Sequence, residues 1–223
     1  MGLDRRPQPR DSTDMQTKDP RPEPSFRLPA VPAELEWRLQ PAAWAVEPGG
    51  GLSIRAGEMT DLFFDPNGRT KNDAAPAALF APPDRAFTLS SLVRVEFSST
   101  YDAGVLHVRA AEDRWAKLCF EYSPQGEPMV VSVVTHGLSD DCNSIIVTGE
   151  SVYLRAAQDG AVTAFHYSLD GARWHFVRYF SLGPRENLRV GFSSQSPTGT
   201  GCRAAFSDIR YRPGFPADLR SGE

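Results

Sequence analysis

The sequence predicts an all-β protein built as a two-sheet antiparallel β-sandwich, or jelly roll. Three observations predict it. About a dozen short segments alternate apolar and polar residues with the period of two that strands require. β-Branched and aromatic residues dominate these segments, and Gly, Asp, Asn and Pro residues separate them. No segment shows a convincing helical period, so two packed sheets are the expected architecture.

The predicted strands follow one another with few interruptions. Those before residue 140 are GLSIRA (51–56), TDLFF (60–64), FTLSSLVRVEF (87–97), AGVLHVRA (103–110), WAKLCFEY (115–122) and MVVSVVTH (129–136). Those after it are SIIVT (144–148), SVYLRAA (151–157), AVTAFHYS (161–168), WHFVRYF (174–180), NLRVGFSS (187–194) and CRAAFSDIRY (202–211). Gly-containing turns such as 124–126, 159–160 and 170–171 join successive strands.

Two tails flank the predicted sandwich, which spans residues 33–212. Residues 1–32 are rich in Pro and Arg and poor in apolar side chains, so they bury too little surface to offset the entropy of ordering. They predict an extended, flexible N-terminal tail. Residues 213–223 have a similar composition and predict a C-terminal tail.

Composition excludes several classes of function. The net charge of -4 provides no basic surface for nucleic acid or anionic membranes. No run of about 18 apolar residues exists, and the charged first residues lack the apolar core of a secretory signal. Three widely spaced cysteines form neither a disulfide framework nor a zinc motif. We therefore expect a cytoplasmic protein without a cofactor.

The segment YSLDGARWHFVRYF (167–180) raises the question of whether its polar residues perform chemistry. Ser168 and Asp170 are placed to cap turn amides, Gly171 fits a tight turn, and Trp174 is placed to pack beneath it. The arrangement resembles the Asp-box hairpin of sialidases, with one residue fewer between Asp and Trp. That resemblance implies an architectural role away from any active site.

A wider set of stretches resembles one family. They are MTDLFFDP (59–66), KNDAAPAALF (71–80), the segment 84–123, VVSVVTHGLSDD (130–141), SLDGARWHFVRYFSL (168–182) and the segment 190–211. Together they resemble the family of domains of unknown function that includes the fungal "regulation of enolase" protein, over residues 37–212. The resemblance implies a concanavalin-A-like lectin/glucanase sandwich that binds ligands on the concave face of one sheet. The family pattern places Trp after Ser139-Asp140, whereas this chain has Asp141 and Cys142 there. An aromatic ligand platform at that place would therefore be lost or replaced.

A polar stripe in WAKLCFEY is the main candidate site. Alternation directs Trp115, Lys117, Cys119 and Glu121 to one face of the strand and apolar side chains to the other. His107 and Arg109 of the preceding strand join this face if the two strands pair through a loop with an odd number of residues. The ordinary alternative is a solvated sheet face with weak cross-strand pairs.

The predicted ligand-binding residues comprise the aromatic and polar side chains along this stripe and its rim. They are Trp115, Arg109, Asp102, Tyr101, Thr135 and Asp140, with Asp141 as a further rim candidate. Trp115 is a candidate sugar-stacking platform, although a core cap beside a turn is an alternative. Acidic residues in loops often only form turns, which is the alternative for Asp102 and Asp140.

Ordinary glycosidase chemistry is not predicted. Glucanases of the fold carry their paired carboxylates in a Glu-x-Asp-x-Glu run, and Glu121 has no such acidic neighbours. No metal site is predicted, because the Asp65 to Asp73 segment is explained by a Pro-Asn-Gly turn. Three hypotheses follow: a lectin-like domain that binds a sugar or another small polar ligand; an isomerase, lyase or cyclase using Glu121, Lys117 or His107 as acid and base; or a protein-interaction regulator of a metabolic enzyme.

Overall fold

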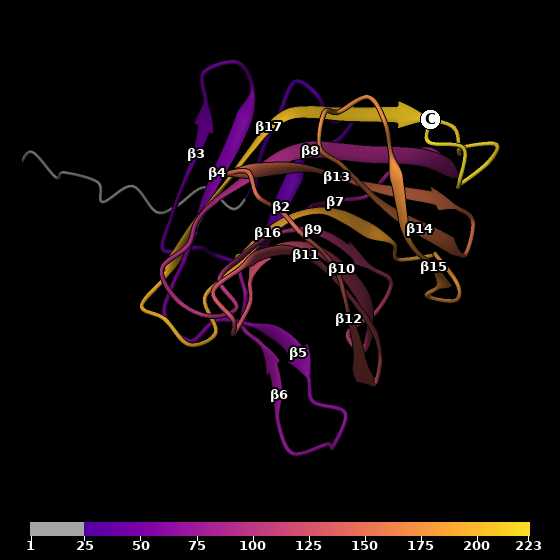
Figure 1. The fold of residues 1–223 in the computed structure, drawn as a ribbon. Helices are drawn as coiled ribbons and strands as arrows, with labels where there is room; N and C mark the ends of the chain where they lie inside the picture. The colour runs from indigo at the N-terminus through magenta and orange to yellow at the C-terminus, as the bar shows by residue number, and fades with distance from the viewer. Residues whose placement is uncertain (1–24) are drawn as a thin grey trace, which may run out of the picture.

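The computed structural model describes residues 25–223, which form a sandwich of two antiparallel sheets (Figure 1). One sheet contains, in spatial order, β1 (Ser25–Phe26), β2 (Leu35–Leu39), β7 (Ala77–Phe80), β16 (Arg189–Gln195), β9 (Ala103–Arg109), β10 (Arg114–Tyr122), β11 (Pro128–His136) and β12 (Leu138–Ile146). The other contains β15 (His175–Ser181), β14 (Val162–Ser168), β13 (Ser151–Asp159), β8 (Ala86–Glu96), β17 (Cys202–Pro213), β4 (Gly51–Ala56) and β3 (Ala43–Glu47). The predicted all-β antiparallel sandwich is confirmed.

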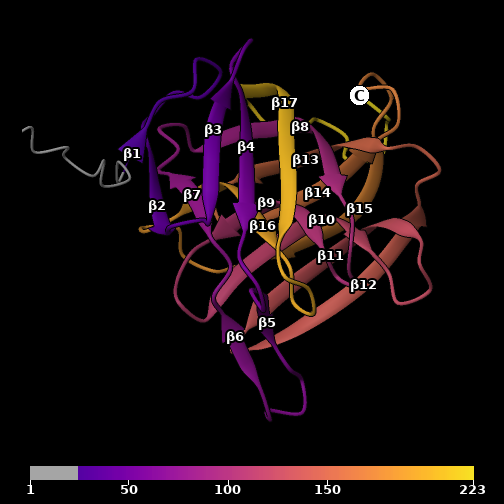
Figure 2. The ribbon, with the colours of Figure 1, turned by 90° about the vertical axis from the view of Figure 1, so that its left-hand side faces the viewer.

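A separate hairpin of β5 (Leu62–Phe64) and β6 (Lys71–Asp73) belongs to neither sheet. Figures 1 and 2 show it on the far side of the eight-stranded sheet from the seven-stranded sheet. Its turn is the one that the sequence predicts: the Gly68 amide donates to Asp65 O at 2.8 Å, and the Asn67 amide donates to Asp65 Oδ1 at 2.8 Å. Residues 25–223 contain no helix that is long and apolar enough to cross a membrane.

Apolar side chains from both sheets fill the space between them. The largest fully buried members of this core are Phe80, Phe87, Phe120, Phe165, Phe192 and Phe206. They come from strands that alternate inward and outward side chains, which is why period-two patterns located most strands correctly. The pattern misplaced β12, which begins at Leu138 rather than at residue 144. This edge strand is mostly exposed and therefore has no apolar alternation to detect.

The described parts of the two predicted tails are packed on the sandwich. Residues 25–32 contribute β1 and the buried side chains of Phe26 and Leu28. The Phe26 ring packs against that of Trp44, with 4.5 Å between the ring centres. The rest of the predicted N-terminal tail lies outside the described residues. At the other end, the Trp174 amide donates to Gly222 O at 2.9 Å and the Arg155 guanidinium donates to Glu223 O at 2.8 Å.

The segment 167–180 contains the end of β14, a turn, and most of β15 in the seven-stranded sheet. Asp170 Oδ1 accepts hydrogen bonds from the amides of Ala172 and Arg173, each at 2.9 Å, and Ser168 Oγ accepts one from the Gly171 amide. These bonds hold the pKa of Asp170 at about 2. The side-chain hydrogen bonds of Asp170 thus lie within the turn, as expected for an architectural motif.

We predict that Gly171→Ala destabilises the protein more than Gly137→Ala. Both glycines have a φ of 74°, where Ala costs about 1–2 kcal/mol. A Cβ at residue 171 would lie 2.8 Å from Tyr153 Cζ, whereas nothing lies within 4 Å at residue 137. Crowding adds about 1 kcal/mol to the loss at residue 171. Urea unfolding measures both losses, and equal losses would contradict packing of the turn against Tyr153.

Candidate functional site

The polar stripe lies on the outer face of the eight-stranded sheet. Antiparallel pairing places Trp115 opposite Arg109 and Lys117 opposite His107. The prediction that these residues share one face is therefore confirmed. Glu121 lies on the same face, four residues after Lys117 along β10. Side chains on the other face of β10, such as Leu118 and Phe120, enter the core between the sheets.

Strand β5 of the β5–β6 hairpin packs on this outer face, and Figure 2 shows the rest of the hairpin extending beyond the sheet. The Phe64 ring packs edge-on against the Trp115 indole at 5.5 Å, and Leu62 is fully buried beside them. The Phe64 amide donates to Ser139 Oγ at 2.9 Å, which fixes the hairpin to β12. The stripe is therefore buried rather than a solvated surface, and Lys117 is only 2% exposed.

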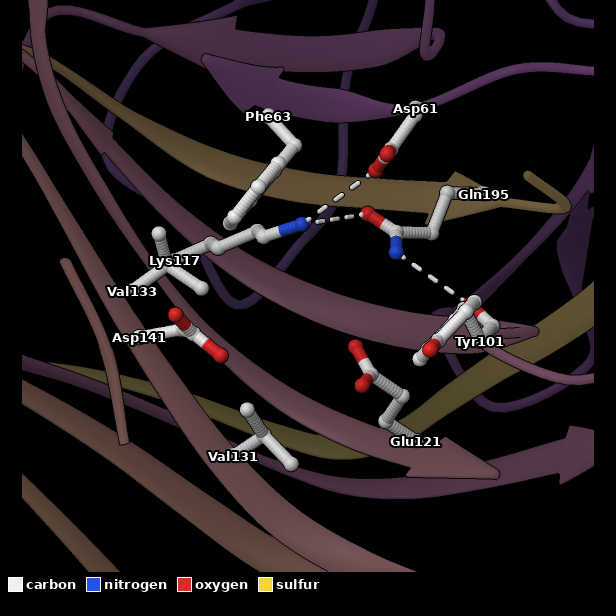
Figure 3. A pocket seen from close by; sticks show the side chains of 9 residues that line it. All are labelled: Asp61, Phe63, Tyr101, Lys117, Glu121, Val131, Val133, Asp141 and Gln195. Carbon is white, nitrogen blue, oxygen red and sulfur yellow. Dashed lines mark hydrogen bonds and ion pairs between the residues drawn. The ribbon is translucent and has the colours of Figure 1, made fainter. Parts of the chain in front are cut away.

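A pocket of about 250 Å³ opens beside the hairpin (Figure 3). Side chains from the hairpin, the β8–β9 loop and four strands of the sheet line it. They are Asp61, Phe63, Tyr101, Lys117, Glu121, Val131, Val133, Asp141 and Gln195. The pocket thus combines two aromatic rings, three carboxyl groups, one ammonium group and one amide.

Lys117 is held by two partners from distant parts of the chain. Its Nζ donates to Gln195 Oε1 at 2.9 Å and lies 3.4 Å from Asp61 Oδ1 (Figure 3). Burial lowers the pKa of Lys117, but Asp61, with further help from Glu121, raises it above its ordinary value. The ammonium group is therefore charged at neutral pH, and its charge is already paired.

Glu121 differs from Lys117 in having a buried carboxyl group without a hydrogen-bonding partner among residues 25–223. Glu121 is 9% exposed, and Figure 3 shows its carboxyl group directed into the cavity. Burial raises the pKa of Glu121 to about 7; Lys117 opposes this change, and Asp61 and Asp141 add to it. This buried group can therefore accept hydrogen bonds from an external donor.

Tyr101 stands at the mouth of the pocket because Asp102 organises its loop. Asp102 is fully buried, and its carboxylate accepts bonds from Ser98 and Ser99 amides and from Ser196 Oγ at 2.7 Å. Tyr101 adopts a φ of 68°, which is uncommon for a residue with a side chain, and remains 40% exposed. Asp102 does not line the pocket itself: its acceptors are used to fix the loop.

Three other residues predicted for ligand binding also lie outside the pocket. Trp115 is fully buried beneath Phe64, so its ring faces are not open to a sugar, and the alternative of a core cap describes it correctly. Thr135 is buried and its Oγ1 lies 2.8 Å from Ser139 Oγ. Asp140 points away from the cavity and pairs with Arg178 at 2.8 Å, while its neighbour Asp141 lines the cavity.

Of the remaining predicted residues, Arg109 lies at the other end of the stripe, opposite Trp115, and His107 lies opposite Lys117. Arg109 Nη2 lies 3.1 Å from Asp73 Oδ2, and Arg38 shares this carboxylate. His107 is fully buried and neither ring nitrogen has a partner among the described residues. Burial, together with Arg109, Arg38 and Lys117, holds the pKa of His107 well below its ordinary value. His107 is therefore neutral and does not line the pocket, which does not suit it as an acid or base there.

Sequence reasoning missed Asp61, Phe63 and Gln195 as pocket residues. Asp61 and Phe63 belong to the segment 60–64, which resembled one more strand of the sandwich rather than a cover for it. Gln195 follows Gly191 and Ser193 with a period of two along β16, but only the pairing of β16 with β9 brings it beside Lys117. Residues 25–223 hold no cluster of three or more His, Cys, Asp or Glu side chains suited to a metal ion.

A family model described as "Protein of unknown function (DUF1349)" matches residues 37–214. The chain belongs to this family. The match agrees with the predicted resemblance in both position and extent. Among curated proteins, none matches the DUF1349 chain in sequence.

Solved structures with the same sandwich include one from yeast and several glycoside hydrolases. A functionally unknown protein from Saccharomyces cerevisiae is 24% identical, with a TM-score of 0.72 over 82% of this DUF1349 chain and 97% of the yeast chain. The GH43 protein BlXynB from Bacillus licheniformis is 17% identical, with a TM-score of 0.63 over 78% of this chain and 35% of its own. A xylan β-1,4-xylosidase from Bacillus halodurans is 15% identical, with a TM-score of 0.57 over 72% and 32%. The DUF1349 chain thus corresponds to about a third of these two enzymes, and the likeness shows a shared fold.

We predict that Glu121→Gln stabilises the protein at pH 8 and not at pH 4.5. The pKa of Glu121 is about 7 in the folded protein against 4.5 ordinarily, so protonation favours folding. The contribution is fully present below pH 4.5 and is lost as the pH rises through 7, which amounts to about 3 kcal/mol. The free energy of unfolding of the Gln variant should exceed that of the wild type by about this amount at pH 8.

The exposed Glu58→Gln change is the matched control, because it removes the same charge without burial. Its free energy of unfolding should follow that of the wild type across the pH range. A Glu121→Gln curve parallel to the wild-type curve would contradict a raised pKa in the folded protein.

Proposed function

We propose that this domain binds a small carbohydrate in the pocket between the β5–β6 hairpin and β10. The observation that carries the proposal is the buried, unpartnered carboxyl group of Glu121, which faces a cavity that the aromatic side chains of Phe63 and Tyr101 also line (Figure 3). A sugar ring combines apolar C–H faces with hydroxyl groups at its edge. Aromatic rings suit the faces, and fixed acceptors suit the hydroxyl groups.

The polar groups of the pocket fit this role better than they fit a scaffold. Glu121 and Asp141 offer carboxylate oxygens, and neither is used by a hydrogen bond from residues 25–223. Gln195, in contrast, accepts a hydrogen bond from Lys117 and donates one to Tyr101 O at 3.2 Å, and it thereby connects two walls of the pocket. A cavity of about 250 Å³ is smaller than the range of about 300–1,000 Å³ for drug-sized ligands, which favours a single sugar unit.

The fold supports the proposal to a limited extent. The same sandwich forms about a third of BlXynB and of a xylan β-1,4-xylosidase. Since function depends on the site and not on the fold, this likeness favours carbohydrate as the ligand class without naming the sugar.

Turnover of the bound ligand is the second candidate, and one observation favours it. A carboxyl group with a pKa of about 7, as in Glu121, can both donate and accept a proton near neutral pH. Lys117 is occupied by Asp61 and Gln195, and His107 lies outside the pocket, so Glu121 would act with Asp141 alone. Chromatography of sugars after incubation with the protein tests this candidate, and unchanged sugars would exclude it for those compounds.

We predict that Tyr101→Ala weakens monosaccharide binding and that Tyr179→Ala does not. Both side chains are similarly exposed, at 40% and 50%, but Tyr179 lies on β15 of the other sheet. Loss of one aromatic contact is worth about 0.5–1.5 kcal/mol, or about a 2- to 12-fold weaker affinity.

Titration calorimetry with xylose, glucose, galactose and glucosamine measures these affinities. Wild-type protein should bind at least one of the four sugars. Absence of binding to all of them, or equal effects of the two Tyr variants, would contradict a sugar site at this pocket.

A further inference from the structure

We propose that the pocket selects a ligand with a protonated amine, and that its carbohydrate is therefore an amino sugar. This inference rests on the proposed function for the sugar, but the preference for a cation follows from the pocket itself. It depends on the charges that line the pocket, on the burial of Glu121, and on the aromatic rings at the mouth.

The charges in the pocket do not balance. Asp61, Glu121 and Asp141 can each carry a negative charge, and Lys117 supplies the one positive charge among the lining residues. Lys117 is bound to Asp61 and to the amide of Gln195, at 3.4 and 2.9 Å. Among residues 25–223, no second cation lines the cavity for the buried carboxyl group of Glu121 or for that of Asp141, which is an exposed residue (Figure 3).

Glu121 needs a donor that the described residues do not provide. It is 9% exposed, and a buried carboxylate without hydrogen bonds is unfavourable. A neutral hydroxyl group would give one hydrogen bond, whereas an ammonium group provides up to three donors together with the missing charge. Either donor would make a charge-assisted bond to an ionised carboxylate, but only the ammonium group adds the attraction between opposite charges, which is strong in a site shielded from water.

The aromatic side chains favour the same ligand. Phe63 from the hairpin and Tyr101 from the β8–β9 loop line the cavity that contains the free carboxyl groups. The face of an aromatic ring attracts a cation within about 6 Å. Rings and carboxylates around one small cavity therefore both attract a positive group, and both disfavour an anionic sugar such as a uronate.

The titration of Glu121 agrees with this geometry. Burial is the main cause that raises the pKa of Glu121 to about 7. Lys117 lowers this pKa in part, and Asp61 and Asp141 raise it because they repel the ionised form. A bound cation would favour that ionised form. Binding of a permanently charged cation should therefore strengthen as the pH rises from 6 to 8 and should release a proton at pH 6.

Titration calorimetry of the wild-type protein near pH 7 tests the inference with five compounds. They are glucosamine, glucose, N-acetylglucosamine, glucuronate and choline. Glucosamine should bind at least tenfold more tightly than glucose and N-acetylglucosamine, and glucuronate should bind least. Choline, whose charge does not depend on pH, should bind more tightly at pH 8 than at pH 6.

Two variants place the preference in the pocket. Glu121→Gln and Asp141→Asn should each reduce the affinity for glucosamine about tenfold or more and that for glucose less than threefold. Asp140→Asn is the matched control, since it removes the same charge one residue away, where the side chain pairs with Arg178 outside the pocket. It should leave the ratio of the two affinities within twofold of the wild-type ratio.

The outcomes separate this inference from the proposed function. Equal binding of glucose and glucosamine would overturn the amine preference and leave a carbohydrate site. Binding of choline without any sugar would support the cation site and overturn carbohydrate binding. Binding of none of the five compounds would overturn both. A glucosamine preference that survives in Glu121→Gln would overturn the assignment of the cation site to this pocket.

Discussion

The architecture of the site depends on one buried ammonium group. Lys117 can lie on the sheet at 2% exposure because Asp61 and Gln195 together compensate its loss of water. Asp61 stands at the base of the β5–β6 hairpin and Gln195 ends β16, so these contacts connect three parts of the chain that are distant in sequence. The hairpin is fixed at its other side by Phe64 against Trp115. Without this cover, the outer face of the sheet would be an open polar surface without a cavity.

Three acidic side chains of this protein differ in whether their surroundings provide hydrogen-bond donors for the carboxyl group. Asp170 accepts bonds from turn amides and Asp102 accepts bonds from Ser98, Ser99 and Ser196, so each is satisfied by its own surroundings. Glu121 is buried like Asp102 but has no such donors among residues 25–223. A large core between the sheets can compensate the unfavourable burial of one carboxyl group. Such a local sacrifice of stability is characteristic of sites that bind or react.

The sequence predicts the fold well and the site in part, and the reason is the range of the interactions. Alternation within WAKLCFEY is a local property, so it places Lys117 and Glu121 on one face correctly. The role of Trp115 depends on what covers it, and the covering Phe64 lies about 50 residues earlier, in a segment that itself resembles an ordinary strand. Gln195 becomes a neighbour of Lys117 only because β16 inserts beside β9, which no local pattern indicates.

The stripe is divided into two electrostatically different ends. At one end Arg38 and Arg109 share Asp73, and their positive charges help to keep the intervening His107 neutral. At the other end Glu121 and Asp141 face the cavity, and Lys117, the cation that lines it, is paired with Asp61. Because His107 is neutral, it adds no further positive charge beside Lys117. Under the proposed preference for an amine, this asymmetry would draw a positive group toward Glu121 and away from the arginines. Asp73 offsets only one of the two arginine charges, so that end of the stripe stays positive. The orientation of a charged ligand would thus depend on this distant end as well as on the contacts that the ligand makes in the pocket.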